Sequence, residues 1–296
     1  MTQSFSNPQF TEILAPNSNV KIPEKSNDLS DFLQETLAMN KRLFIQLKRR
    51  PSTLIAGVIQ PFMWLILFGA LFFHAPNNLF GNNANYGQFL APGIIIFTAF
   101  SGALNAGLPI MFDREFGFLN RLLVAPLASR FSIVLASTIY IITLSLIQTA
   151  VIITASAFIG AGLPSLGGLS AIVLIVFLIV LGVTGLSLGL AFALPGHIEL
   201  LAVIFVINLP LLFASTALAP LSFMAEWLQV IASLNPLTYA IEPIRYIYQN
   251  SDWSFVSIVM NTPWGSLKFV TVLSLLFIFD VVILLSIKPL LSRRFA

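Results

Sequence analysis

The chain has 296 residues, of which 57% are hydrophobic and only 9% charged, with a formal net charge of +3 and no cysteine. Soluble domains carry about 25% charged residues, so the composition excludes an ordinary soluble protein. The apolar runs are continuous, which excludes a membrane β-barrel because barrel strands alternate apolar and polar residues. The sequence therefore predicts an all-α integral membrane protein, and the lack of cysteine excludes disulfides and thiolate metal sites.

The N-terminal segment is expected to stay outside the bilayer. Residues 1–28 are polar and lack the apolar centre of a signal peptide, so they are predicted to form a disordered cytosolic tail. Residues 29–50 place apolar side chains at helical spacing with charges between them, which predicts an amphipathic interfacial helix on the inner leaflet. A solvated connector without membrane contact is the alternative. The residues assigned to this interfacial helix include Phe32, Leu33, Leu37, Phe44, Leu47, Arg49 and Arg50.

Residues 51–296 are predicted to form a transmembrane domain of six helices. A helix needs about 20 apolar residues to cross a bilayer. The uncharged run 51–112 is far longer, so it must fold back at the Asn- and Gly-rich segment 74–87. A second uncharged run, 131–198, divides in the same way at 160–168. The expected crossings lie near 53–73, 88–110, 131–159, 169–194, 199–219 and 266–287.

The positive charges orient these crossings. Nearly all of the 15 Lys and Arg residues fall before the first crossing, between the second and third, or after the sixth. Only Arg245 and Lys268 fall on the other side. Since basic residues collect on the cytoplasmic side of membrane proteins, both termini are expected in the cytosol of a bacterial-type plasma membrane.

The segment 220–248 is too apolar for an ordinary outer loop. Its centre, Asn235-Pro236, breaks any helix, so the segment is predicted to form two short re-entrant helices before the last crossing. A seventh and an eighth crossing are the alternative, but each half has about 14 residues and is too short to span. The outer residues of interest are Trp227, Asn235, Pro236, Tyr239 and Arg245.

An island of charge, FDREFGFLNRLLVAPLASR (112–130), separates the two uncharged runs. It is predicted to form a short cytosolic helix that Asp113 caps and that Pro126 limits to about three turns. Its apolar residues recur at three- and four-residue steps and form one stripe. The helix could rest on lipid, or it could be a docking peg for a cytosolic partner. The stripe consists of Phe116, Leu119, Leu123 and Leu127.

This island resembles the loop between the second and third crossings of ABC-2 type ABC transporter permeases. KRRPSTLIAGVIQPFMWLILFGALF (48–72) is similar to the start of that family's first crossing, and SLNPLTYAIEPIR (233–245) to its outer segment. Together with the order of the six helices, the resemblance covers nearly everything after residue 30. It implies two permeases side by side, the second identical or homologous, and two copies of a cytosolic ABC ATPase subunit.

The resemblance also implies that the island is the coupling helix seated on the ATPase. Carried over by position, the ATPase-coupling residues are Asp113, Arg114, Glu115, Phe116, Gly117, Leu119, Arg121, Leu123, Pro126 and Leu127. The chain has no G-x-x-x-x-G-K-[ST] motif, so any ATP site and its Mg must belong to another polypeptide. No cofactor, metal site or nucleic-acid partner is expected of this chain, and membrane lipid surrounds it.

Polar residues are scarce within the expected crossings. Gln60, Gln148 and Asn208 are the amides that could line a translocation path. Asp280 is expected to form a structural hydrogen bond rather than a proton relay. Gly182, Gly185 and Gly189 allow a close helix contact, which is expected within the chain rather than across a dimer.

The sequence is thus interpreted as the membrane subunit of an ABC exporter, not itself an enzyme. Family resemblance, rather than composition, implies that it moves an amphipathic, hydrophobic or lipid-linked substrate out of the cytosol or inner leaflet. An ATP-independent secondary transporter or channel is the first alternative. An integral membrane enzyme or a non-transporting scaffold is the second. Neither alternative accounts for the charged island.

Overall fold

The computed structural model describes residues 28–72, 74, 86–117, 131–250 and 252–295, and it confirms an all-α membrane fold. Five helical stretches are long and apolar enough to cross a bilayer. The fifth expected crossing, near 199–219, has 17 residues, at the lower limit for spanning. The elements are α2 (Asp28–Arg49), α3 (Ser52–Leu71), α4 (Tyr86–Leu104), α5 (Gly107–Glu115), α7 (Phe131–Phe158), α8 (Leu166–Ala193), α9 (His197–Phe213), η2 (Leu221–Phe223), α10 (Glu226–Leu234), α11 (Pro236–Gln249), β1 (Ile258–Thr262), β2 (Gly265–Lys268) and α12 (Phe269–Phe295).

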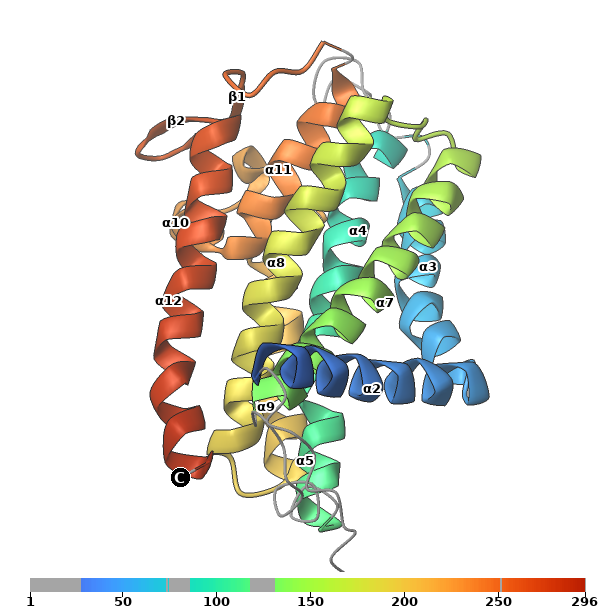
Figure 1. The fold of residues 1–296 in the computed structure, drawn as a ribbon. Helices are drawn as coiled ribbons and strands as arrows, with labels where there is room; N and C mark the ends of the chain where they lie inside the picture. The colour runs from blue at the N-terminus through green and yellow to red at the C-terminus, as the bar shows by residue number, and fades with distance from the viewer. Residues whose placement is uncertain (1–27, 73, 75–85, 118–130, 251, 296) are drawn as a thin grey trace, which may run out of the picture.

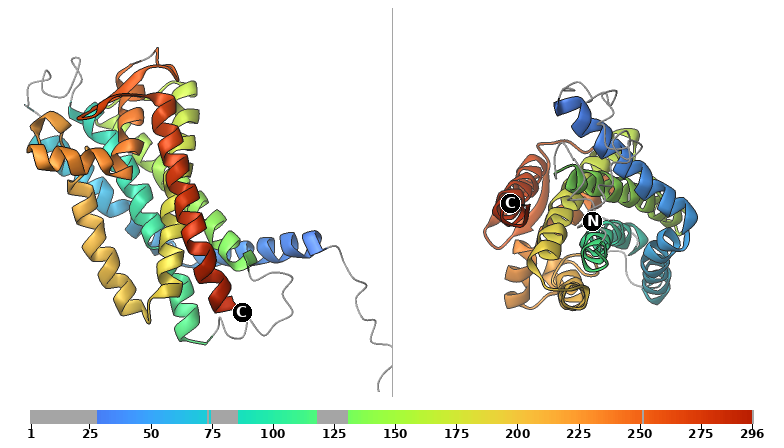
Figure 2. Two further views of the ribbon diagram at one scale, coloured as in Figure 1. Left: turned by 90° about the vertical axis from the view of Figure 1, so that its left-hand side faces the viewer. Right: turned by 60° about the horizontal axis from the view of Figure 1, so that its bottom comes forward.

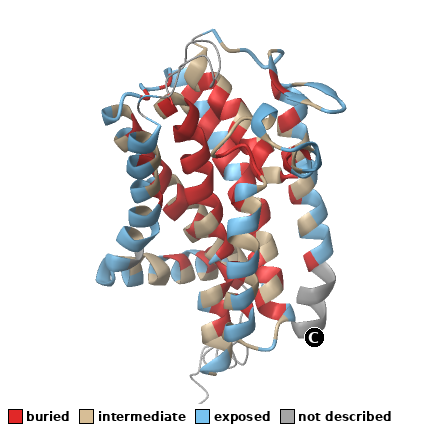
Figure 3. Cartoon of the chain, turned by 180° about the vertical axis from the view of Figure 1, so that it is seen from behind, coloured by how far each residue is buried: buried red, intermediate tan, exposed pale blue. Residues whose placement is uncertain are grey.

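The helices α4 and α8 form the centre of the bundle (Figure 1). Both are mostly buried, whereas α3 and the part of α12 up to Ile287 expose many apolar side chains (Figure 3). A helix that is apolar all round belongs in a protein core or in lipid. The exposed apolar surface of α3 and α12 is therefore the surface that a bilayer would cover.

The glycines of α8 pack against α12 within this one chain, as predicted. A Cβ on Gly182 would overlap with Asp280 and Phe279, and one on Gly189 would lie 2.8 Å from Ile287. Close approach of this kind is what small residues allow between membrane helices. The Asp280 carboxylate is almost fully buried and lies directly against Gly182 of α8.

The second expected crossing is broken near its C-terminal end. The α4 helix stops at Leu104, and α5 restarts at Gly107 and runs to Glu115 instead of ending near 110. The buried hydroxyl of Ser187 in α8 donates to the Leu104 carbonyl at 2.5 Å and accepts from the Gly107 N–H at 2.9 Å. Because no water reaches backbone groups inside a membrane, this side chain supplies the bonds that the break removes.

The amphipathic helix α2 lies across the bundle, as Figure 2 shows from two sides. Thr36 and Asn40 are buried, and the Phe44 ring meets Tyr140 of α7 edge-on at 5.5 Å. Leu29, Leu33 and Leu37 remain exposed on its N-terminal half. The helix therefore rests on α7 along one edge and presents a row of leucines beside it.

At the opposite end of the bundle the structure departs from the sequence prediction twice. The α9 helix ends at Phe213 rather than near 219. Its last carbonyls, those of Leu211 and Ala214, accept hydrogen bonds from the Asn235 amide, so a side chain replaces the continuing helix. In addition, β1 and β2 form an antiparallel hairpin before α12, which displaces the start of α12 to Phe269.

Candidate functional site

Three consecutive charged residues at the end of α5 contact three different elements. We call Asp113, Arg114 and Glu115 the charged cluster. Asp113 forms an ion pair with Arg42 of α2, with the two side chains 3.6 Å apart. Both partners are about one-third exposed or more, so solvent screening limits this pair to about 0–1 kcal/mol.

The other two residues of the charged cluster bind the turn between α8 and α9. The Arg114 guanidinium donates to the carbonyls of Ala191, Leu194 and Pro195 at 3.0, 2.6 and 2.5 Å. Glu115 accepts from the backbone N–H of His197 at 2.6 Å and contacts its Nδ1 at 2.5 Å. A cation thus meets a helix C-terminus and an anion meets a helix N-terminus, the arrangement that the helix dipoles favour.

The prediction that Asp113 caps the start of a new helix is wrong. Asp113 lies in the last turn of α5, and Gly117 follows with a positive φ of 75°. Glycine adopts this left-handed conformation without a steric penalty, so it ends the helix there. Phe116, the first residue of the predicted apolar stripe, is 79% exposed. The other predicted coupling residues, Leu119, Arg121, Leu123, Pro126 and Leu127, lie outside the described residues.

The residues predicted for the interfacial helix do lie on α2, but they face different surroundings. Phe32, Phe44 and Leu47 are partly buried, whereas Leu33 and Leu37 are exposed. Arg49 ends the helix and Arg50 follows it, both exposed. Sequence reasoning did not single out Arg42, which carries the contact with the charged cluster, because nothing local shows which of several basic residues has a distant partner.

The predicted outer segment contains the two short helices α10 and α11, broken at Asn235. Besides its bonds to α9, Asn235 accepts from the Leu237 N–H and so caps α11, with Pro236 in the first turn. Both choices are favoured at a helix start. Trp227 is 68% exposed, and Tyr239 is partly buried against the core.

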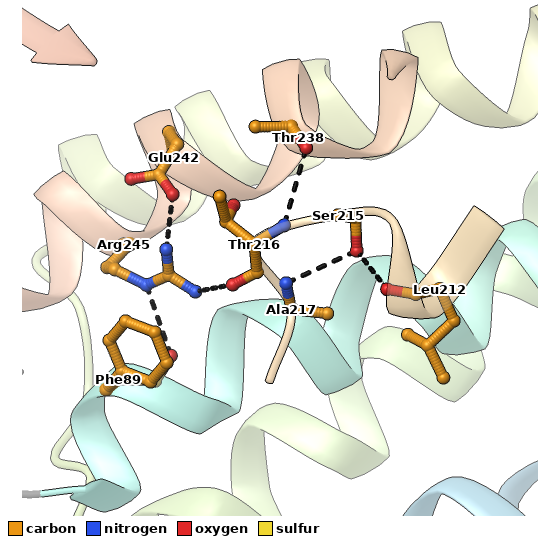
Figure 4. Close-up of polar contacts among 8 residues, drawn as sticks. All are labelled: Phe89, Leu212, Ser215, Thr216, Ala217, Thr238, Glu242 and Arg245. Atoms are coloured by element: carbon orange, nitrogen blue, oxygen red, sulfur yellow. Dashed lines mark hydrogen bonds and ion pairs between the residues drawn. The ribbon is translucent and has the colours of Figure 1, made fainter. Parts of the chain in front are cut away.

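Arg245, also predicted here, is buried and joins three elements (Figure 4). Its guanidinium pairs with Glu242, donates to the carbonyls of Phe89 and Thr216, and lies 3.8 Å from the centre of the Phe89 ring. Burial lowers the pKa of Arg245, while the Glu242 carboxylate raises it. These bonds fix α11 to α4 and to the turn after α9.

The three amide side chains predicted to line a translocation path, those of Gln60, Gln148 and Asn208, all lie beside α4. Gln60 and Gln148 line one cavity of about 360 Å³ between α3, α4 and α7. Ser101 of α4, which lines the same cavity, donates to Asn208 of α9 at 3.2 Å. The described part of the chain contains no cluster of side chains that could hold a metal ion.

Comparison with known proteins identifies the family. Residues 34–249 match the ABC-2 type transporter family, which is more than half of the chain. This chain belongs to that family. It is 56% identical over 264 residues to the transport permease ycf38 of Porphyra purpurea, covering 89% of this chain and 91% of the relative. It is 54% identical over 274 residues to ycf38 of Cyanophora paradoxa, covering 92% and 94%.

A more distant relative has a named role. The doxorubicin resistance ABC transporter permease DrrC of Mycobacterium tuberculosis is 26% identical over 238 residues, covering 78% of this chain and 82% of the relative. As an ABC-2 permease, this chain is a multi-pass transmembrane subunit of an ABC transporter. Such subunits lack an ATP site of their own, and the family implies a partner ATPase subunit.

Proposed function

We propose that this ABC-2 permease moves an amphipathic, hydrophobic or lipid-linked substrate out of the cytosol or inner leaflet. A separate ATPase subunit drives the movement. The proposed complex contains two permeases, the second identical or homologous, and two ATPase subunits that carry ATP and Mg. The permease lies in a bacterial-type plasma membrane with both termini in the cytosol.

The observation that carries this proposal is the charged cluster. One short segment at the end of α5 contacts α2, the C-terminus of α8 and the N-terminus of α9. A movement of this segment would therefore be transmitted to several helices together. Conformational coupling requires this kind of rigid link between a moving partner and the elements that it rearranges.

The position of Phe116 fits the same role. It directly follows α5, and its ring stacks at 6.1 Å on Phe112, whose ring is in turn 5.2 Å from His197. An exposed aromatic residue on a well-supported base is a typical anchor for a partner protein. We therefore place the ATPase against Phe116 and the residues that follow it, with α2 beside them.

Copurification from native membranes tests the proposal. The tagged chain should bring down a stoichiometric soluble ATPase, and Phe116→Asp or Leu123→Asp should remove it. The matched control is Phe158→Asp, since Phe158 is 88% exposed at the end of α7 that is farthest from the charged cluster. Normal ATPase recovery with both Phe116→Asp and Leu123→Asp would refute the coupling assignment. Recovery of the chain with no ATPase under several solubilisation conditions would favour an ATP-independent transporter.

A further inference from the structure

The cavity between α3, α4 and α7 has an unusual wall for a membrane-spanning region. It is lined partly by Gln60, Ser101, Asn105 and Gln148, and none of its described lining residues is charged. Its volume of about 360 Å³ is at the small end of the range for ligand pockets. Other cavities differ, since the groove between Phe62 and Phe158 is lined almost entirely by apolar residues.

One buried acceptor in the wall of this cavity has no partner among the described residues, and a second unpartnered acceptor lies beside it. Gln148 is 3% exposed and Ser145 is 1% exposed, yet Gln148 Oε1 and Ser145 Oγ form no hydrogen bond there. A buried polar group left unpaired costs free energy, and the cost is larger in a membrane because no bulk water is present. Such groups are retained where something else supplies the bond.

Glycines let α3 and α4 approach these groups closely. Glycines face Gln148 on both helices: a Cβ on Gly57 would overlap with its amide, and a Cβ on Gly102 would lie 3.3 Å from Oε1 and 3.5 Å from Ser145 Oγ. Pro61, also in the wall, has no N–H to donate to the Gly57 carbonyl. The cavity therefore has a wall that carries a surplus hydrogen-bond acceptor.

We infer that this cavity binds the polar end of an uncharged amphiphile whose hydroxyl or amide group donates a hydrogen bond to Gln148. A charged head group is disfavoured because no lining residue offers a counter-charge, and an isolated charge is costly inside a bilayer. Ala56, Gly57 and Gln60 are exposed on α3, so the cavity opens at the surface of a membrane-spanning helix. An apolar chain can then remain in the bilayer.

This inference rests on the proposed function, because it names the substrate class of the same permease. The site also adjoins the elements that the charged cluster would move. Ser101 belongs to the last turn of α4, and Asn105 lies in the break that Ser187 bridges. A rearrangement at this break would change the shape of the cavity.

Photolabelling of the purified chain in phosphatidylcholine nanodiscs tests the inference. The probe is monooleoylglycerol carrying a diazirine and an alkyne, and the comparison probe is oleic acid carrying the same groups. We expect the glyceride to label residues 97–109 or 140–148, unlabelled monooleoylglycerol to compete, and the carboxylate to label them weakly. Competition by the glyceride, despite the excess of bilayer lipid, distinguishes a preferred ligand from the surrounding phospholipid.

Variants assign the labelling to the cavity. Gln148→Leu keeps the side-chain volume and removes the acceptor, so labelling should fall about fivefold, as for one lost hydrogen bond. Ala56→Phe fills the cavity from its exposed wall and should reduce labelling even if Gln148→Leu folds poorly. Thr154→Val, on the same helix as Gln148 but outside the cavity, should leave labelling unchanged.

Equal labelling by both probes, or labelling that neither cavity variant reduces, would overturn the inference. The measurement uses the permease alone and needs no ATP. Its failure would remove the ligand site and leave the ATPase assignment standing, whereas failure of the copurification would remove the ATPase assignment first.

Discussion

The contribution of Arg114 to stability depends on which groups its side chain can reach. Its three carbonyl acceptors lie in the turn where α8 ends, about 80 residues away in sequence. Hydrogen bonds that involve a charged group contribute roughly 1.5–3 kcal/mol each when well formed. Arg42, on the neighbouring α2, instead forms one exposed ion pair with Asp113. Arg42 and Arg114 are therefore expected to contribute different amounts to the stability of the fold.

We expect Arg114→Met to destabilise the chain by about 2 kcal/mol, because it leaves the α8 carbonyls without their donors. Methionine keeps much of the apolar stem, so the loss reports on the guanidinium. The matched change Arg42→Met should cost less than about 1 kcal/mol, as is usual for exposed ion pairs. Thermal unfolding of both variants in detergent measures the difference. Equal losses would show that the Arg114 hydrogen bonds are not a major support of this end of the bundle.

At the scale of elements, the break between α4 and α5 adjoins both regions of proposed function. The wall of the cavity with Gln148 runs across the break from Ser101 to Pro109, and the charged cluster follows at the end of α5. Ser187 bridges the break with a hydroxyl that is fully buried. The α4–α5 segment is thus a helix with a defined joint, and α8 supplies the hydrogen bonds at that joint.

Ser187→Ala should destabilise the protein by about 1–2 kcal/mol, because it leaves the Leu104 carbonyl and the Gly107 N–H unpaired in the membrane. The control is Ser274→Ala in α12, since the exposed Ser274 hydroxyl only donates to Val270 within its own helix. Unfolding midpoints in detergent compare the two. If Ser274→Ala lowers the unfolding midpoint as much as Ser187→Ala does, the Ser187 hydrogen bonds do not specifically stabilise the break between α4 and α5.

The helices could be predicted because apolar length and helix breakers are local properties of the sequence. A helix expected at 29–50 is observed at Asp28–Arg49, and the expected break at Asn235 is present. The joint at Asn105 was missed, although Pro109 gives a local signal, since it cannot donate to the carbonyl four residues earlier. The β1–β2 hairpin was also missed, although the Pro263–Gly265 turn between two short segments is a recognisable pattern.

The long-range contacts of the candidate site could not be predicted from one sequence. Arg114 and Ala191 are separated by 77 residues, and Arg245 and Phe89 by 156. Composition and periodicity say which faces are polar, but they do not say which distant backbone carbonyl a guanidinium will find. The position of Gln148 opposite two glycines could not be predicted either, because it depends on how α3, α4 and α7 pack.

At the scale of the whole molecule, α4 and α5 connect the two ends of the bundle. Near one end the Phe89 carbonyl receives Arg245, and at the other end the charged cluster binds α2, α8 and α9. The start of α2 and the end of α12 lie towards the end that carries the charged cluster, and the hairpin lies at the other (Figure 1). If α9 crosses the bilayer, an odd number of crossings separates α2 from the hairpin, so the two lie on opposite sides of the membrane.

Single-cysteine labelling tests this arrangement, and the natural chain, which has no cysteine, serves as its own blank. Ser30→Cys in α2 and Ser266→Cys in β2 place exposed thiols at the two ends. With a membrane-impermeant maleimide, Ser266→Cys should react in right-side-out vesicles and Ser30→Cys only in inverted ones, because basic residues favour the cytosolic side. The reverse result would invert the topology. Reaction of both from one side would mean that α9, with only 17 residues, does not cross the membrane.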